Sequence, residues 1–140
     1  LLELEINENS IMKNPELSED ILKNIRKLGI KITLDDFGSG YSSLGKLKDY
    51  PIHTINVSKS LVRGVIENYQ DAAVASAIVS MAHKLNIKVN AEGIETMEQL
   101  EFMRYLRCEY FQGFLFARPM SGLEIRKFIL DKVKQLSFSL

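Results

Sequence analysis

The chain has 140 residues, 46% hydrophobic and 26% charged, a composition typical of one soluble globular domain. Its 18 basic and 18 acidic residues give a formal net charge of zero, which argues against a nucleic-acid-binding protein. No apolar run approaches the ~18 residues that a membrane-spanning helix needs, so we expect no membrane insertion.

Alternating apolar and polar residues predict five strands, and helical periodicity follows each of them. The expected strands are 2–6, 30–36, 53–58, 87–91 and 108–111. The expected helices are 15–28, a short one from 42 to about 50, 60–66, 71–85, one that begins at Thr96, and 122–136. We expect residues 1–136 to form one unit and 137–140 to be a tail.

The chain has a single cysteine, Cys108, which excludes an internal disulfide and fits a reducing compartment. It shows no signal peptide, so we expect a cytoplasmic protein. It also lacks an initiator Met, and it reads as a piece that begins inside a domain.

Strands that alternate with helices predict a parallel sheet with right-handed crossovers. Two architectures remain open on this pattern: an open doubly wound sheet, or part of a (βα) barrel. Each predicted strand ends near a polar residue, and in barrels the carboxyl ends of the strands form the active face. This observation favours an incomplete TIM-like barrel.

Four acidic residues follow or end three of these strands: Glu5, Asp35, Asp36 and Glu92. Carboxylate oxygens without a partner His or Cys suit Mg²⁺ or Mn²⁺ rather than zinc. Two such ions would polarise a phosphate and generate hydroxide for phosphodiester hydrolysis. The alternative, that these acids only cap helices and lie solvated in loops, stays open at this point.

Four segments in this order resemble the EAL domain family, bacterial phosphodiesterases that linearise cyclic di-GMP. The segments are Leu4-Glu5-Ile6, Leu34-Asp35-Asp36-Phe37-Gly38-Ser39-Gly40-Tyr41-Ser42-Ser43-Leu44, Ala91-Glu92-Gly93-Ile94-Glu95-Thr96 and Phe111-Gln112-Gly113-Phe114-Leu115-Phe116-Ala117-Arg118-Pro119. The resemblance covers the whole chain and the C-terminal portion of the family, and it implies a modified (βα) barrel.

The resemblance also implies residue roles. Glu5, Asp35 and Glu92 match metal ligands, Asp36 matches a ligand of a second Mg²⁺ or Mn²⁺ ion, and Gln112 matches a residue that orients the site. Residues of the loop that couples substrate, metal and dimer interface match Phe37, Gly38, Ser39, Gly40 and Tyr41. Glu95 resembles the acid that anchors this loop. Arg118, which precedes Pro119, is a candidate phosphate contact, with a structural ion pair as the alternative.

Three departures count against catalysis. The Glu-Ala-Leu strand that names the family and an upstream Asn ligand are absent. The third strand reads Ile55-Asn56-Val57-Ser58, so Asn56 occupies the position of the family's catalytic Lys. An amide supplies no cation and no acid or base. We therefore weigh two hypotheses: a degenerate domain that binds cyclic di-GMP or a protein partner, and an active phosphodiesterase in the full-length parent that tolerates Asn56.

An incomplete barrel exposes two strand edges, which favour pairing with another chain. Alternation also predicts an exposed apolar inner face, formed by Ile32, Leu34, Ile55, Val57 and Val89. We therefore expect a homodimer or another association through these surfaces.

Overall fold

A computed structural model describes residues 2–38 and 44–137. Its strands are β1 (Glu3–Asn7), β2 (Lys31–Phe37), β3 (Thr54–Val57), β4 (Lys88–Glu92) and β5 (Tyr110–Gln112). Its helices are α1 (Glu8–Met12), α2 (Pro15–Lys27), α3 (Leu44–Leu47), α4 (Lys59–Gly64), α5 (Tyr69–Lys84), α6 (Met97–Tyr105) and α7 (Gly122–Ser137). The short α1 was not predicted. Because α7 reaches Ser137, the proposed tail overlaps it by one residue, and 138–140 lie outside the described residues.

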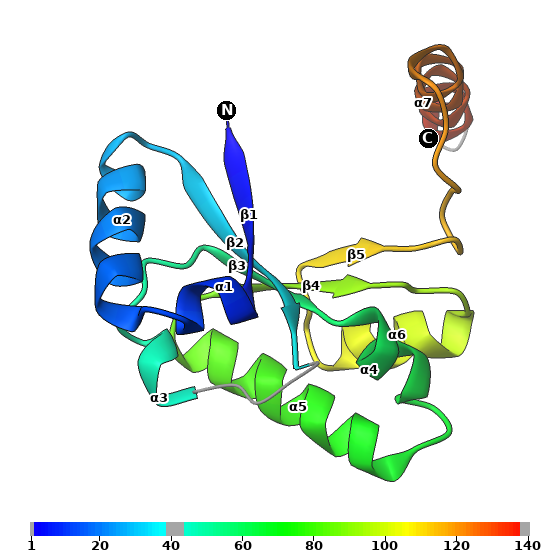
Figure 1. Ribbon diagram of the computed structural model, residues 1–140. Helices are drawn as coiled ribbons and strands as arrows, with labels where there is room; N and C mark the ends of the chain where they lie inside the picture. Colours follow the sequence, from blue (N-terminus) through cyan, green and yellow to red (C-terminus); the bar gives the residue numbers. More distant parts are fainter. Residues whose placement is uncertain (1, 39–43, 138–140) are drawn as a thin grey trace.

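The five strands form one parallel sheet in the order β1-β2-β3-β4-β5 (Figure 1). A doubly wound sheet reverses its strand order at a switch point, and this sheet never does. The order therefore decides between the two architectures that the sequence left open, in favour of part of a (βα) barrel. β1 and β5 are the two edges of the sheet.

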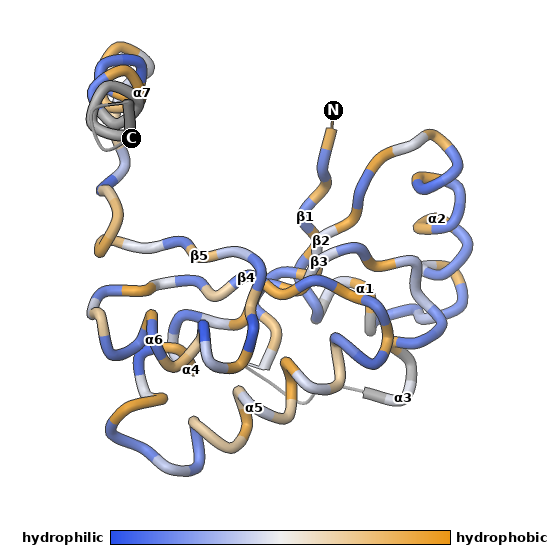
Figure 2. Tube along the Cα trace, turned by 180° about the vertical axis from the view of Figure 1, so that it is seen from behind, coloured by the Kyte–Doolittle hydropathy of each residue, from blue (hydrophilic) through white to orange (hydrophobic). Residues whose placement is uncertain are grey.

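Helices α4, α5 and α6 lie together on one side of the sheet, and the rear view shows the same grouping (Figures 1 and 2). Helix α7 stands apart from them in both views. The helices are defined by local signals. For example, Thr96 and Gln99 form a capping box at the start of α6, which satisfies backbone N–H groups that have no partner inside the helix. The crossovers thus cover one face of the sheet and leave the other open.

The prediction of an exposed apolar inner face is wrong. The five side chains proposed for it are completely buried: Ile32, Leu34, Ile55, Val57 and Val89. Parallel crossovers place helices against the apolar face of the sheet, so this alternating set packs into the core beneath them. The open face is made by the other alternating set, which is polar and includes Glu5, Thr33, Asn56 and Asn90.

Cys108 is buried just before β5. Burial raises the pKa of its thiol to about 12, so at pH 8 only roughly 10⁻⁴ of the folded molecules carry the reactive thiolate. We expect iodoacetamide to alkylate Cys108 slowly in the native chain and at a normal rate in urea. Because the folded pKa is the higher one, this burial also costs stability as the pH rises from about 9 through 12. Equal alkylation rates with and without urea would contradict the buried assignment.

Candidate functional site

The centre of the open face is an amide from β3 that lies between two carboxylates. Asn56 Nδ2 donates to Asp35 Oδ1 on β2 at 3.2 Å and to Glu92 Oε1 on β4 at 3.0 Å. The Asn56 side chain is buried, and Asp35 and Glu92 are half-buried. Three neighbouring strands therefore bring three of the predicted site residues together, as expected for the carboxyl ends of parallel strands.

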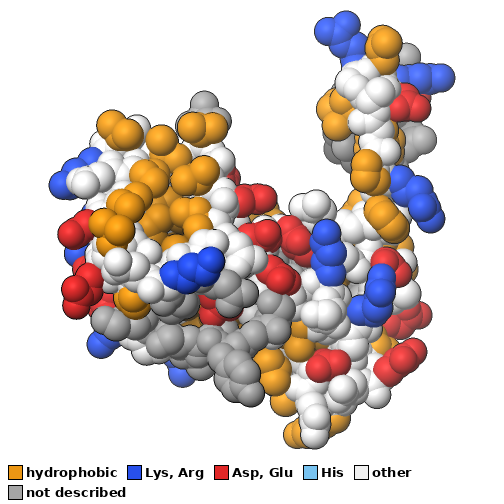
Figure 3. Space-filling model, viewed as in Figure 1, with side chains coloured by type: hydrophobic (Ala, Val, Ile, Leu, Met, Phe, Trp, Pro, Cys, Tyr) orange, Lys and Arg blue, Asp and Glu red, His pale blue; other side chains and the backbone are white. Residues whose placement is uncertain are grey.

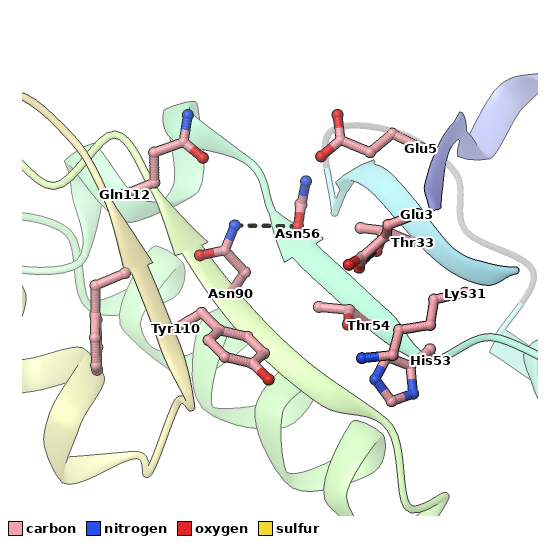
Figure 4. A pocket seen from close by; sticks show the side chains of 11 residues that line it. Glu3, Glu5, Lys31, Thr33, His53, Thr54, Asn56, Asn90, Tyr110 and Gln112 are labelled. Carbon is pink, nitrogen blue, oxygen red and sulfur yellow. Dashed lines mark hydrogen bonds between the residues drawn. The ribbon is translucent and has the colours of Figure 1, made fainter. Parts of the chain in front are cut away.

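A second asparagine, which the sequence reading did not single out, supports the first. Asn90 pairs with Asn56 in the β3–β4 register, and its Nδ2 donates to Asn56 Oδ1 at 3.2 Å (Figure 4). The signal was present in the sequence, because Asn90 lies two residues before Glu92 and so shares its face of the strand. The two amides form a short hydrogen-bonded row across the sheet.

Negative charge gathers around Glu92. Burial, followed by the charge of Asp35, raises the pKa of the Glu92 carboxyl, and Glu5 and Asp36 add smaller contributions in the same direction. Lys59 opposes this rise in the pKa. Figure 3 shows acidic side chains collected in the hollow of the molecule, with basic ones beside them. All four predicted acidic residues are thus electrostatically coupled within one region.

Carboxylate oxygens are the ligands that Mg²⁺ and Mn²⁺ prefer. Among residues 2–38 and 44–137, however, no group of three or more His, Cys, Asp or Glu side chains is arranged to hold a metal ion. Two of the four candidate carboxylates, Asp35 and Glu92, are instead joined through Asn56. The described residues therefore do not fit a complete metal site, and metal binding by Glu5, Asp35, Asp36 and Glu92 stays a prediction.

A cavity of about 410 Å³ opens on the polar face, and Asn56 and Asn90 are among the residues that line it. Its lining is shown in Figure 4, where Glu5 on β1 and Gln112 on β5 lie on either side of Asn56. Gln112 is the last residue of β5, and its backbone oxygen accepts a hydrogen bond from Ile94 N at 3.0 Å. Gln112 also lines a second cavity, so it borders both.

The second cavity, of about 770 Å³, lies beside α4, the β4–α6 turn and the segment after β5. Three cationic side chains line it: Lys59, Arg63 and Arg118. The Arg118 guanidinium lies 4.8 Å from the centre of the Phe114 ring. The cavity therefore combines positive charge with an aromatic surface, within the 300–1,000 Å³ typical of small-molecule sites.

Glu95, the predicted anchor of the loop after β2, forms an ion pair with Arg63 on α4 at 3.0 Å. Ser39, Gly40 and Tyr41 lie outside the described residues, so the anchoring role stays a prediction. Phe37 is buried in the core, and its role in substrate binding stays a prediction. Gly38 has φ = +91°, and a Cβ there would lie 2.8 Å from Ile78 Cδ1, so the turn requires glycine.

One acid was missed altogether. Glu8 is the first residue of α1 and is buried, and its Oε1 has no hydrogen-bond partner within the part of the chain that the structure describes. A buried carboxylate oxygen without a hydrogen-bond partner is costly. No spacing signal distinguishes Glu8 from the neighbouring acids Glu3 and Glu5, because its burial depends on the unpredicted helix α1.

Residues 1–119 match the EAL domain family. The cyclic di-GMP phosphodiesterase NbdA of Pseudomonas aeruginosa is 41% identical over 128 residues, which are 91% of this chain and 16% of NbdA. The structure of the PaMucR phosphodiesterase in complex with c-di-GMP is 40% identical with a TM-score of 0.85, over 89% of this chain and 50% of that one.

Klebsiella pneumoniae BlrP1, solved with manganese and cyclic di-GMP, is 34% identical with a TM-score of 0.77, over 84% of this chain and 30% of that one. The chain thus spans about half the length of the solved PaMucR chain and a much smaller share of NbdA. The family match covers most of its length and includes every strand of the sheet. The chain therefore belongs to the EAL domain family.

Proposed function

We propose that this chain is a cyclic di-GMP-binding EAL domain that does not hydrolyse its ligand. The observation that carries the proposal is the amide of Asn56, which joins Asp35 and Glu92 where the family resemblance expects a Lys ammonium. A neutral amide neither stabilises a hydroxide nucleophile nor transfers a proton. Catalysis at this centre therefore lacks its cation, whereas ligand binding does not depend on it.

The cavity beside α4 supports the binding half of the proposal. Cyclic di-GMP has two phosphates and two guanine bases, and Arg118, which lies over the Phe114 ring, offers a guanidinium for a phosphate. Lys59 adds positive charge to the same lining, whereas Arg63 there is paired with Glu95. The PaMucR structure is described as a c-di-GMP complex, and it is similar to this chain over 89% of its length.

The proposal is tested by measuring binding and turnover separately on the same protein. Isothermal titration with cyclic di-GMP is expected to show saturable binding, weakened by Arg118→Ala. Chromatography of the nucleotide after incubation with Mn²⁺ is expected to show no linear product. Turnover by the unmodified protein, or no binding at all, would refute the proposal.

The alternative is a Mg²⁺- or Mn²⁺-dependent cyclic di-GMP phosphodiesterase in a longer protein that contains this chain. One observation favours it: Lys59 packs against the left-handed Gly93, where an added Cβ would lie 3.0 Å from Lys59 Cγ. Lys59 therefore lies near Glu92, and the positive charge of Lys59 lowers the Glu92 pKa, against the rise caused by burial and by Asp35. Lys59 would then supply the positive charge that Asn56 lacks.

We also propose that the chain associates through its open sheet edges. Most of β1 is exposed, and unpaired N–H and C=O groups of an edge strand readily add another strand. A second copy of the chain is the partner we expect. Multi-angle light scattering at micromolar concentration should then give a mass above 15.9 kDa, and a mass equal to the monomer would contradict the proposal.

Among the helices that the structure describes, none combines the length and the apolar character that a membrane span requires.

A further inference from the structure

The outer face of β1, which is the face that the helices cover on the other strands, and helix α7 both carry exposed apolar side chains. We propose that α7 of one copy packs over the outer face of β1 and along α2 of a second copy. Each copy then gives and receives one α7, which closes the assembly at two chains. The inference rests on the proposed association through open sheet edges and deepens it. It does not depend on cyclic di-GMP binding.

The outer face of β1 continues the core but is left uncovered. Leu4 pairs with Ile32 and Ile6 with Leu34 in the β1–β2 register, so their side chains share one face of the sheet. Ile32 and Leu34 are completely buried, whereas Leu4 is 38% exposed and Leu2, on the same face, is 66% exposed. In a (βα) barrel a ring of helices covers this face of every strand. Within the described residues no helix precedes β1, so this strip has room for one.

Helix α7 has apolar side chains but no second strand to cover. Leu123, Ile129 and Leu130 are 84%, 53% and 55% exposed. The helix after a strand of a parallel sheet is the right-handed crossover to the next strand, and it packs on both. Here β5 is an edge, and within the described residues no strand follows it. The β1 strand of a second copy, placed beside β5, supplies the strand that α7 would cover.

Helix α2, which lies between β1 and β2 in the chain, has an apolar stripe that α7 can pack against. Leu17, Ile21 and Leu28 are exposed and recur at the spacing of one side of a helix. On α7, Leu123 and Leu130 lie seven residues apart and so also share one side. Helices with such stripes pack side by side. An α7 that covers β1 of the second copy therefore also meets α2 of that copy.

The charges favour the same alignment. Because α2 and α7 each follow a strand of one parallel sheet, they run in the same direction around a barrel and their first turns lie side by side. Glu16 and Asp20 near the start of α2 then meet Arg126 and Lys127 near the start of α7, and all four are exposed. Figures 1 and 2 show α2 and α7 at opposite ends of the sheet within one chain. The contact therefore forms only between two copies.

Cross-linking between two single variants tests this contact. Leu17→Cys and Leu123→Cys are purified separately, mixed until subunits have exchanged, and treated with a short bismaleimide. We expect a covalent dimer in the mixture and none with either variant alone, which also reports any reaction of the buried Cys108. Tyr69→Cys is the matched control for Leu123→Cys, because Tyr69 is 86% exposed and begins α5. Equal cross-linking of Leu17→Cys with both partners would overturn the inference.

The mass of Ile129→Asp, measured by multi-angle light scattering over a dilution series, is the second test. We expect its dimer dissociation constant to rise at least about tenfold, because the contact would bury the new charge. Ile66→Asp, between α4 and α5, is the control, since Ile66 is 48% exposed and Ile129 53%. It should match the unmodified chain, and circular dichroism verifies that both variants are folded.

The two tests separate this inference from the association on which it rests. A dimeric unmodified chain whose mass is unaffected by Ile129→Asp, with no cross-link between Leu17→Cys and Leu123→Cys, would overturn the exchange of α7 and leave the association standing. A monomeric unmodified chain would overturn both.

Discussion

Replacing Asn56 with lysine is expected to raise the rate of cyclic di-GMP hydrolysis by about 10²–10⁴-fold, the usual contribution of one positioned acid–base group. The new ammonium would stand between Asp35 and Glu92 and supply the cation that the amide cannot. The rate is measured by chromatography of the linear product with saturating Mn²⁺. The longest protein that contains this chain is used, since the chain covers only half of the solved PaMucR chain.

Asn90→Lys is the matched control for this gain of activity. It adds the same charge to the same face of the sheet, on the neighbouring strand, but outside the space between the two acids. It is expected to leave turnover at the level of the unmodified protein. Robust turnover before any substitution, abolished by Lys59→Met, would instead favour the phosphodiesterase alternative with Lys59 as the cation.

Replacing Gly113 with alanine is expected to destabilise the fold by about 3 kcal/mol, the upper end of the usual cost of overpacking. An added Cβ would lie 2.0 Å from Ile94 O and 2.4 Å from Ile94 N, and backbone atoms cannot move aside as a flexible side chain can. Both atoms are engaged: Ile94 N donates to Gln112 O, and Ile94 O accepts from Leu115 N, each at 3.0 Å. The substitution would push the β5–α7 segment away from the β4–α6 turn.

Urea unfolding followed by circular dichroism measures this loss as a lower midpoint with an unchanged slope. Gly122→Ala is the control, because a Cβ there meets no atom within 4 Å and Gly122 is the first residue of α7. It should unfold at the midpoint of the unmodified chain or slightly above it. Equal midpoints for the two variants would show that Gly113 is not confined by Ile94.

Local patterns in the sequence are enough to predict the strands, because each has a short alternating run that ends at a polar residue. The structure places the second strand at 31–37 and the fourth at 88–92, close to the predicted 30–36 and 87–91. The capping box at Thr96 is equally local, since its partners are three residues apart. Helix α1 was missed, because its five residues are too few for a periodic signal.

The two faces of the sheet show the limit of such patterns. Alternation correctly sorts Ile32, Leu34, Ile55, Val57 and Val89 onto one side, but it does not say which side the helices cover. The sequence-based prediction places this set in the open interior, and the structure buries it under the crossovers. The choice depends on the handedness of the crossovers and the curvature of the whole sheet, which no single segment contains.

The sequence by itself determined the family, the parallel βα pattern and the departure at Asn56, because each of these is written in consecutive residues. Only the tertiary structure decided that the strands are in sequential order and that the polar set lines the open face. It also decided that Asn56 joins Asp35 to Glu92 and accepts a hydrogen bond from Asn90. Asn56 is 21 positions from Asp35 and 36 positions from Glu92 along the chain. Hydrogen bonds between them exist only once three strands pair in register, and register is a property of the assembled sheet.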